Sequence, residues 1–199
     1  ISLKEKSVLY QNHNTYYHTK PNVWFDIDIQ NNQTPTSFGL FFYQDKLNVK
    51  YATALSILVC RHIDEFEEWK NSFRTTFKKE YRDKDYQLYK EHLANRIIEE
   101  VNHILPQLKE NISKIDICTP LSYRDYLNIP DGAMYGLENN VFDLANTTFS
   151  TSTKIKNLFL TGQNINMHGI LGVSITALLT TGEIIGLEYL VDKINKANA

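Results

Sequence analysis

A short apolar strand that breaks at a glycine before a long helix is the feature that most constrains this fold. Residues 158–160 read Leu-Phe-Leu, a run typical of a strand buried on both faces. Gly162 can take the positive φ that a sharp exit from this strand needs. Apolar residues at helical spacing then predict a helix from 170 to about 190. Because the first amides of such a helix are unpaired, the junction is a candidate site for a bound cofactor.

The first half of the chain predicts a mainly antiparallel sheet. Strands are expected at 23–30, 38–44 and 51–61, where apolar residues alternate with polar ones or form short runs. Alternation of this kind implies a sheet with one covered face. The polar connections between the runs are too short for crossovers, so antiparallel pairing is expected.

Two helices are expected to cover this sheet. The first begins at Asp64 as N-cap, with Glu67 at the capping-box position, and has apolar residues on one face as far as Phe77. The second runs from about 85 to 105, and the proline that follows it, Pro106, ends it.

Three local signals follow these helices. Residues 114–119 predict another short strand. Thr119 and Pro120 have the residue types preferred at the N-cap and first position of a helix. Pro130-Asp-Gly132 predicts a turn, because proline and glycine stand where a β-turn favours them.

Composition argues against several classes of function. The net charge is −2 and no dense basic patch is present, so a nucleic-acid partner is not expected. No stretch is apolar and long enough to span a bilayer, and a cytoplasmic location is expected, with peripheral membrane contact left open. The histidines are scattered, which gives a metal site little support. Cys60 and Cys118 are expected to be buried free thiols, and Arg124 and Asp125 to be surface residues.

Several sequence blocks occur together in an order and spacing that match one enzyme family. The blocks are Leu160-Thr-Gly-Gln163, His168-Gly-Ile-Leu-Gly-Val173, Gly182-Glu183 and, upstream, Thr119-Pro120 and Gly132-Ala-Met-Tyr-Gly136. They resemble the C-terminal flavin motif of the phytoene desaturase-like flavoproteins. That family includes carotenoid desaturases, carotenoid isomerases and the all-trans-retinol 13,14-reductases, or retinol saturases, and the histidine-containing block inclines the resemblance toward the saturase and isomerase side.

The resemblance implies an α+β fold in two parts. A mainly antiparallel sheet covered by helices, residues 1–118, corresponds to the substrate domain, and 119–150 form a connecting segment near the substrate and flavin. Residues 151–199 correspond to the last strand and helix of a Rossmann-like FAD-binding domain. The Gly-x-Gly-x-x-Gly turn that grips the FAD pyrophosphate is absent. The chain is therefore expected to be a C-terminal fragment of a longer FAD enzyme, inactive and without bound FAD on its own.

The same resemblance implies a set of cofactor-binding residues in the loop before the last helix. Backbone amides of Gly172 and Val173 would face the flavin, and Gly162, Gln163 and Gly169 would position the flavin or its ribityl chain. His168 is the candidate catalytic residue, as a hydrogen-bond or proton donor. The alternatives are that His168 only caps the loop and that the glycines only permit close packing, a role expected for Gly182 and Gly186.

Four residues are implied to line the substrate side of the flavin: Tyr123, Tyr126, Met134 and Tyr135. Ordinary core packing is the alternative for them. The parent enzyme is expected to act on C=C bonds of a lipophilic polyene or isoprenoid, by saturation, desaturation or isomerisation. Its partners would be that small molecule and the remainder of the FAD domain, N-terminal to this chain. Two other interpretations stay open: an amine-oxidase-like flavoenzyme fragment, and a stand-alone α+β module that binds an apolar ligand or partner.

Overall fold

The chain folds into two compact units. The computed structural model describes residues 1–19, 37–45, 50–73, 82–137 and 139–198. The first unit is Ile1–Gly132 and the second is Ala133–Ala199. The division between them falls within the segment 119–150, which the sequence indicates as a connection.

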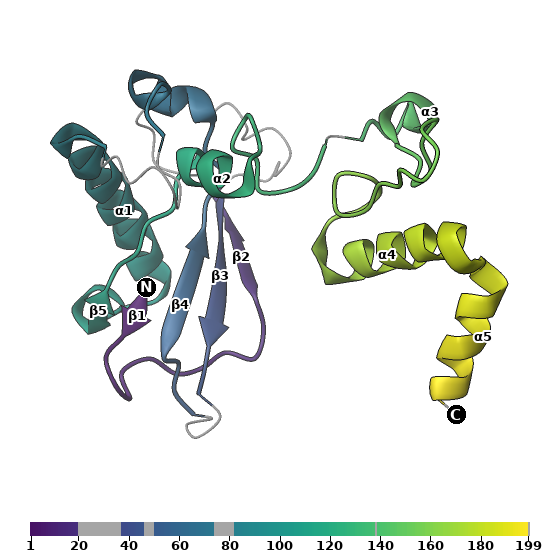
Figure 1. The fold of residues 1–199 in the computed structure, drawn as a ribbon. Coiled ribbons are helices and arrows are strands. Elements are labelled where there is room, and N and C mark those ends of the chain that lie inside the picture. Colours follow the sequence, from purple (N-terminus) through teal and green to yellow (C-terminus); the bar gives the residue numbers. More distant parts are fainter. Residues whose placement is uncertain (20–36, 46–49, 74–81, 138, 199) are drawn as a thin grey trace. The chain divides into compact units, whose positions relative to one another are not determined.

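The first unit is built on a five-stranded antiparallel sheet (Figure 1). The strand order is β2-β3-β4-β1-β5, and the strands are β1 (Ser2–Leu3), β2 (Thr15–His18), β3 (Ser37–Tyr43), β4 (Ala54–Leu58) and β5 (Ile112–Lys114). The α+β fold is therefore confirmed, as are the strands predicted at 38–44 and 51–61, although the second is shorter than expected. The strand predicted at 23–30 lies outside the described residues.

The register of β3 and β4 places large apolar side chains on one face of the sheet. Leu40 lies opposite Ile57, and Phe42 opposite Leu55. Successive residues of a strand point to opposite faces, so these pairs share a face with each other and with Phe38. Leu55 is completely buried there. Burial of such a side chain contributes about 1.5–3 kcal/mol.

Helix α1 (Lys84–Ile104) provides the cover for this face. Its Val101 is fully buried in the same cluster as the sheet residues. Asp83 caps the helix, because its carboxylate accepts the amide of Tyr86 at 2.8 Å. The helix ends just before Pro106, so the helix predicted at 85–105 is confirmed.

A second apolar cluster joins three helices of the first unit. These are α1, the 3₁₀ helix η1 (Ile63–Trp69) and α2 (Pro120–Leu127). The buried members of the cluster are Phe66, Trp69, Tyr86, Leu93 and Leu121.

The start and length of η1 differ from the prediction. His62, not Asp64, is the N-cap: its imidazole accepts the amide of Asp64 at 3.4 Å, and the carboxylate of Glu65 accepts the amide of His62 at 3.2 Å. The capping box therefore begins two residues earlier than the prediction, which required a typical Asp cap and missed histidine in that role. The helix ends at Trp69; residues 74–81, over which the prediction continued it, lie outside the described part.

Glu65 is also expected to give the first unit a pH-dependent stability. It pairs with Arg61 at 2.7 Å, and burial, which outweighs the attraction of Arg61, raises the pKa of Glu65 above its ordinary value of 4.5. Because the folded state then holds this proton more tightly, the contribution is present below pH 4.5 and is lost as the pH rises through the raised pKa. Urea unfolding of wild type and Glu65→Gln from pH 4 to 7 measures it. We expect wild type to lose stability relative to Glu65→Gln as the pH rises; a difference that is independent of pH would contradict this.

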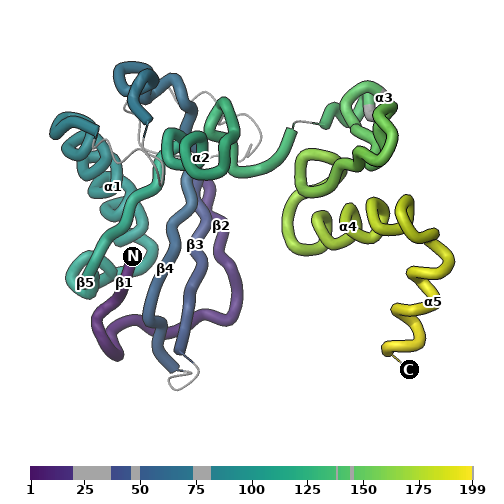
Figure 2. The backbone as a smooth tube through the Cα atoms, viewed as in Figure 1, coloured from purple at the N-terminus to yellow at the C-terminus, as the bar shows by residue number. Residues whose placement is uncertain are grey.

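The segment between α1 and α2 corrects one prediction and confirms another. A one-turn helix, η2 (Lys109–Asn111), leads directly into β5, which pairs with β1 at the N-terminus of the chain (Figure 2). The strand predicted at 114–119 is therefore misplaced. The strand is formed by Ile112–Lys114, because these residues pair with Ser2 and Leu3. Thr119 caps α2 as predicted, with Pro120 at its first position. Cys60 and Cys118 are both exposed, contrary to expectation.

The second unit contains the predicted final helix, interrupted by a glycine. Its helices are α3 (Leu144–Thr147), α4 (Gly169–Ile185) and α5 (Leu187–Ala197). Gly186, with φ +92°, separates α4 from α5, so the single helix predicted from 170 to about 190 is wrong in its second part. Apolar spacing alone does not reveal such a break, because it continues through both helices. None of the helices in the described ranges is long and apolar enough to cross a bilayer.

The apolar run at 158–160 is less buried than predicted. Phe159 forms an isolated antiparallel bridge with Ser152, and Leu158 and Leu160 remain 44% and 36% exposed. The expectation of a strand covered on both faces is therefore wrong for this chain. Within the described residues of the second unit no regular strand flanks this run.

Candidate functional site

The loop between Leu160 and α4 is tied to the helix by threonine side chains. The hydroxyl of Thr180 lies 2.8 Å from the carbonyl oxygen of Leu160 and 2.9 Å from that of Thr176. Thr176 in turn donates to the carbonyl of Gly172 at 2.9 Å. Both threonine side chains belong to buried residues of α4. These contacts fix Leu160 against the second half of the helix.

Two glycines of this loop have open space where a side chain would stand. Gly162 has φ +103° and Gly169 has φ +78°, a region that other residues rarely adopt. A Cβ built on either one meets no atom of the described chain within 4 Å. At these two positions a bound molecule could approach the backbone closely, as the cofactor interpretation requires.

Gly172 has a different role in the structure. A Cβ there would stand 2.5 Å from the carbonyl carbon of Met167 and 2.7 Å from its Cβ, so the loop's own backbone requires this glycine. A Cβ on Gly182 would stand 3.1 Å from the Cδ1 of Leu187, a tight approach that fits the expected packing role of this glycine. Gly186 has no such neighbour, and its positive φ explains the glycine instead.

A second segment of the same unit, 133–137, lies against the loop and brings two candidate residues into contact. The rings of Tyr135 and His168 have centroids 4.3 Å apart. A Cβ on Gly136 would stand 2.6 Å from the carbonyl oxygen of Gln163, so the two backbones are nearly touching. The structure thus assembles Tyr135, His168 and Gln163 at one place, with Gly162, Gly169, Gly172 and Val173 in the same loop and helix start.

The four candidate substrate-lining residues divide between the two units. Tyr123 and Tyr126 lie on α2 of the first unit, whereas Met134 and Tyr135 lie in the second. Tyr126 and Tyr135 are 57% and 51% exposed, which excludes simple core packing for both within this chain. Tyr123 and Met134 are half-buried.

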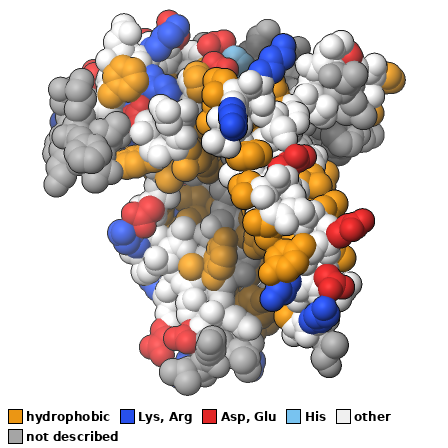
Figure 3. Space-filling view, turned by 45° about the vertical axis from the view of Figure 1, so that its right-hand side comes forward, with side chains coloured by type: hydrophobic (Ala, Val, Ile, Leu, Met, Phe, Trp, Pro, Cys, Tyr) orange, Lys and Arg blue, Asp and Glu red, His pale blue; other side chains and the backbone are white. Residues whose placement is uncertain are grey.

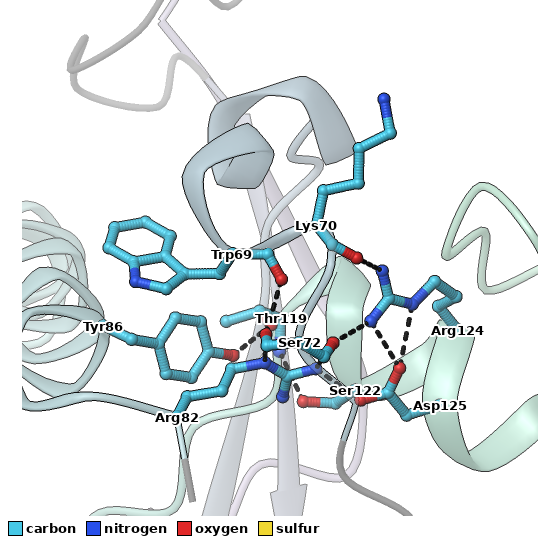
Figure 4. Close-up of polar contacts among 9 residues, drawn as sticks. All are labelled: Trp69, Lys70, Ser72, Arg82, Tyr86, Thr119, Ser122, Arg124 and Asp125. Carbon is cyan, nitrogen blue, oxygen red and sulfur yellow. Dashed lines mark hydrogen bonds and ion pairs between the residues drawn. The ribbon is translucent and has the colours of Figure 1, made fainter. Parts of the chain in front are cut away.

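A buried group of charges holds α2 in place and was missed by the sequence reasoning (Figure 4). We call Asp125, Arg82, Arg124 and Ser72 the Asp125 cluster. The Asp125 carboxylate pairs with both guanidinium groups, and its side chain is 0% exposed, against 5% for Arg82 and 10% for Arg124. The expectation that Arg124 and Asp125 lie on the surface is therefore wrong.

The two guanidinium groups of this cluster also bind backbone. Arg124 donates to the carbonyl oxygens of Lys70 at 2.6 Å and Ser72 at 2.5 Å, and Arg82 donates from Nε to the Ser72 hydroxyl at 2.8 Å. Three segments distant in sequence thus meet at Asp125: residues 70–72, the residue just before the α1 cap, and α2. No local pattern signals this arrangement, because the partners come from separate segments.

A metal centre finds no support in the described ranges. They contain no group of three His, Cys, Asp or Glu side chains that could hold an ion.

The sequence of this chain is similar to that of a class of reductases. The chain is 34% identical to an all-trans-retinol 13,14-reductase of Danio rerio over 136 residues. It is 28% identical to the human protein of the same name and 29% identical to that of Rattus norvegicus, over alignments of the same length. Each alignment covers 67% of this chain and 21–22% of the relative, so the chain spans about a fifth of the length of the relatives it matches.

The similarity confirms the resemblance drawn from the sequence blocks. The chain is similar to all-trans-retinol 13,14-reductases over two thirds of its length, which is consistent with a retinol saturase-like C-terminal portion. No model of a protein family matches it. No solved structure matches it either.

Proposed function

We propose that this chain is the C-terminal part of an FAD-dependent oxidoreductase that acts on C=C bonds of a lipophilic polyene or isoprenoid. The relatives named all-trans-retinol 13,14-reductase support the reaction class, and a reductase of a retinoid is the form they favour. Desaturation and isomerisation are the reactions of the other branches that the sequence blocks resemble. The proposal applies to the longer protein.

The observation that carries the proposal is the loop that ends at α4. Gly162 and Gly169 keep open space beside their backbone, and the helix that follows has 17 residues. The first amides of such a helix lack intrahelical partners, and its N-terminus favours negative charge by about 0.3–2 kcal/mol. These residues fit a flavin, whose reduced ring carries negative charge. When bound, FAD would supply the hydride chemistry, and the unpaired amides of Gly169, Ile170 and Leu171, with Gln163, would hold it. The amides of Gly172 and Val173, at the fourth and fifth positions of α4, face the helix carbonyls of His168 and Gly169 instead.

His168 would serve as the polar side chain of this site. It stands at the N-cap of α4 and is exposed. Its side chain makes no capping hydrogen bond, which speaks against the alternative that it only caps the loop. An imidazole placed there can donate a hydrogen bond to the cofactor or give a proton to a substrate carbon.

The surface of the second unit supports the remainder of the FAD domain as its partner. Helices α4 and α5 expose many large apolar side chains, and hydrophobic atoms are prominent on the surface in Figure 3. The most exposed on these helices are Ile170, Leu171, Ile184, Leu187 and Tyr189. Monomeric proteins rarely leave such a surface open. The same surface also suits the second candidate function, a stand-alone module that binds an apolar ligand or partner.

Flavin content separates the two candidate functions. We expect the chain purified alone to carry no stoichiometric FAD, because it lacks the glycine turn that holds a pyrophosphate. Expressed together with the coding sequence that precedes it, the protein is expected to carry one FAD per chain. Absorbance of the flavin after gel filtration measures both. Stoichiometric flavin on the chain alone would contradict the first expectation, and a longer protein that never binds flavin would favour the module.

A further inference from the structure

Tyr135 and His168 are brought together by a fixed crossing of two segments. Their ring planes are inclined by 39° at a centroid separation of 4.3 Å, which is direct aromatic contact. Gly136, next to the tyrosine, lies against the backbone of Gln163. Further along, the side-chain amide of Asn139 donates to the carbonyl of Asn166 at 3.3 Å. The ring contact is therefore one of three contacts with the loop, made by Tyr135, Gly136 and Asn139.

The imidazole of His168 has no polar partner in the part of the chain that the structure describes. The residue is the N-cap of α4, with φ −84° and ψ 173°, and its ring accepts no helix amide. Gly169, with φ +78°, then turns the backbone into the helix. The tyrosine ring is thus the neighbour that defines the plane of the imidazole.

We propose that Tyr135 is a positioning residue for His168. Its ring fixes the plane of the imidazole and leaves both nitrogens, Nδ1 and Nε2, available to a bound flavin or substrate. A carboxylate or carbonyl partner would occupy one of these nitrogens, whereas an aromatic face occupies neither. The inference rests on the proposed function, which places the loop beside FAD, and it gives Tyr135 a role distinct from lining the substrate.

The contact itself can be tested in this chain without any cofactor. In the chain labelled with ¹³C-histidine, the imidazole protons of His168 should be shielded by the Tyr135 ring current. Tyr135→Leu is expected to move them downfield, whereas Tyr135→Phe, which keeps the ring, leaves them nearly in place. The resonances of His92 and His103 on α1 serve as internal controls. If the His168 signals coincide in wild type and Tyr135→Leu, the rings are not in contact and the proposal fails.

A double-mutant cycle in the longer, FAD-containing protein tests the purpose of the contact. Tyr135→Leu is expected to lower kcat about tenfold or more with little change in KM, since misplacement of a catalytic group acts on the chemical step. Tyr135→Phe, which keeps the ring, should retain a kcat within about twofold of that of the wild type. In a His168→Asn background, Tyr135→Leu should cost nothing further, because it acts through the histidine.

Two outcomes would overturn this assignment. Equal losses from Tyr135→Leu in both backgrounds would mean that the tyrosine acts on the substrate directly. Full activity of His168→Asn would remove the role that the tyrosine is proposed to support. Neither outcome bears on flavin binding or reductase activity of the unmutated protein, so failure of this inference is distinguishable from failure of the proposed function.

Discussion

Asp125→Ala is expected to lower the free energy of unfolding of the first unit by about 3–5 kcal/mol, since it leaves two buried guanidinium groups without their shared counterion. Asp125 is fully buried between Arg82 and Arg124. Both arginines also bind the backbone at Ser72, so they cannot turn to solvent without breaking those hydrogen bonds. Chemical unfolding monitored by the fluorescence of Trp69, which lies in the adjoining cluster, measures the loss.

A matched control for this variant is Asp116→Ala in the same unit. Asp116 forms an ion pair with Lys114 at 2.8 Å, but the two side chains are 70% and 68% exposed, respectively. Surface ion pairs contribute little, so the unfolding midpoint should hardly change. Equal effects of the two substitutions would show that the Asp125 cluster is not the buried centre described above.

Gly172→Val is expected to displace the loop 163–168 and to remove FAD from the longer protein. A Cβ at this position overlaps the backbone of Met167, and backbone cannot move aside as a flexible side chain can. Overpacking of this kind costs about 1–3 kcal/mol or more. The effect on the flavin would then follow from the distorted loop, and not from a side chain that projects into the cofactor. Limited proteolysis of the chain reports the loop, and flavin absorbance reports the cofactor.

Ala177→Val, at an exposed position of the same helix, is the control for Gly172→Val. It introduces the same β-branched side chain into α4, at a helix-propensity cost below about 1 kcal/mol. Flavin content and the proteolytic pattern should stay close to wild type. A Gly172→Val protein that retains its flavin and an intact loop would mean that this glycine is dispensable for the site.

The parts of the fold that the sequence predicts correctly are those decided by neighbouring residues. Alternation in β3 and β4, the apolar face of α1 and the Thr119-Pro120 start of α2 all depend on residues within a few positions of each other. The turn at Gly132 is of the same kind, and its amide donates to the carbonyl of Ile129 at 2.9 Å.

Features decided by distant partners could not be predicted in this way. In the sequence, Arg124 and Asp125 are simply two adjacent charged residues. They are buried because Arg82 and residues 70–72, which are distant in sequence, pack against them. The break at Gly186 also escapes the pattern, because apolar residues continue at helical spacing on both sides of it.

The candidate site was predicted in part, because the resemblance supplied its residues but not their contacts. Its blocks indicated Tyr135 and His168 separately, and the structure shows that their rings touch. The requirement for Gly172 was expected to come from the cofactor, whereas the carbonyl of Met167 provides one within the chain. Packing of this kind depends on the path of the loop backbone, which residue types do not reveal.

The reaction of the longer protein tests the central claim most directly. The protein, expressed with the coding sequence that precedes this chain and loaded with FAD, is reduced anaerobically and mixed with all-trans-retinol. We expect reoxidation of the flavin together with formation of a product that has gained two hydrogens across one C=C bond, as detected by mass spectrometry. A fully loaded flavoprotein whose reduced flavin persists unchanged with all-trans-retinol and with other polyenes would contradict the account.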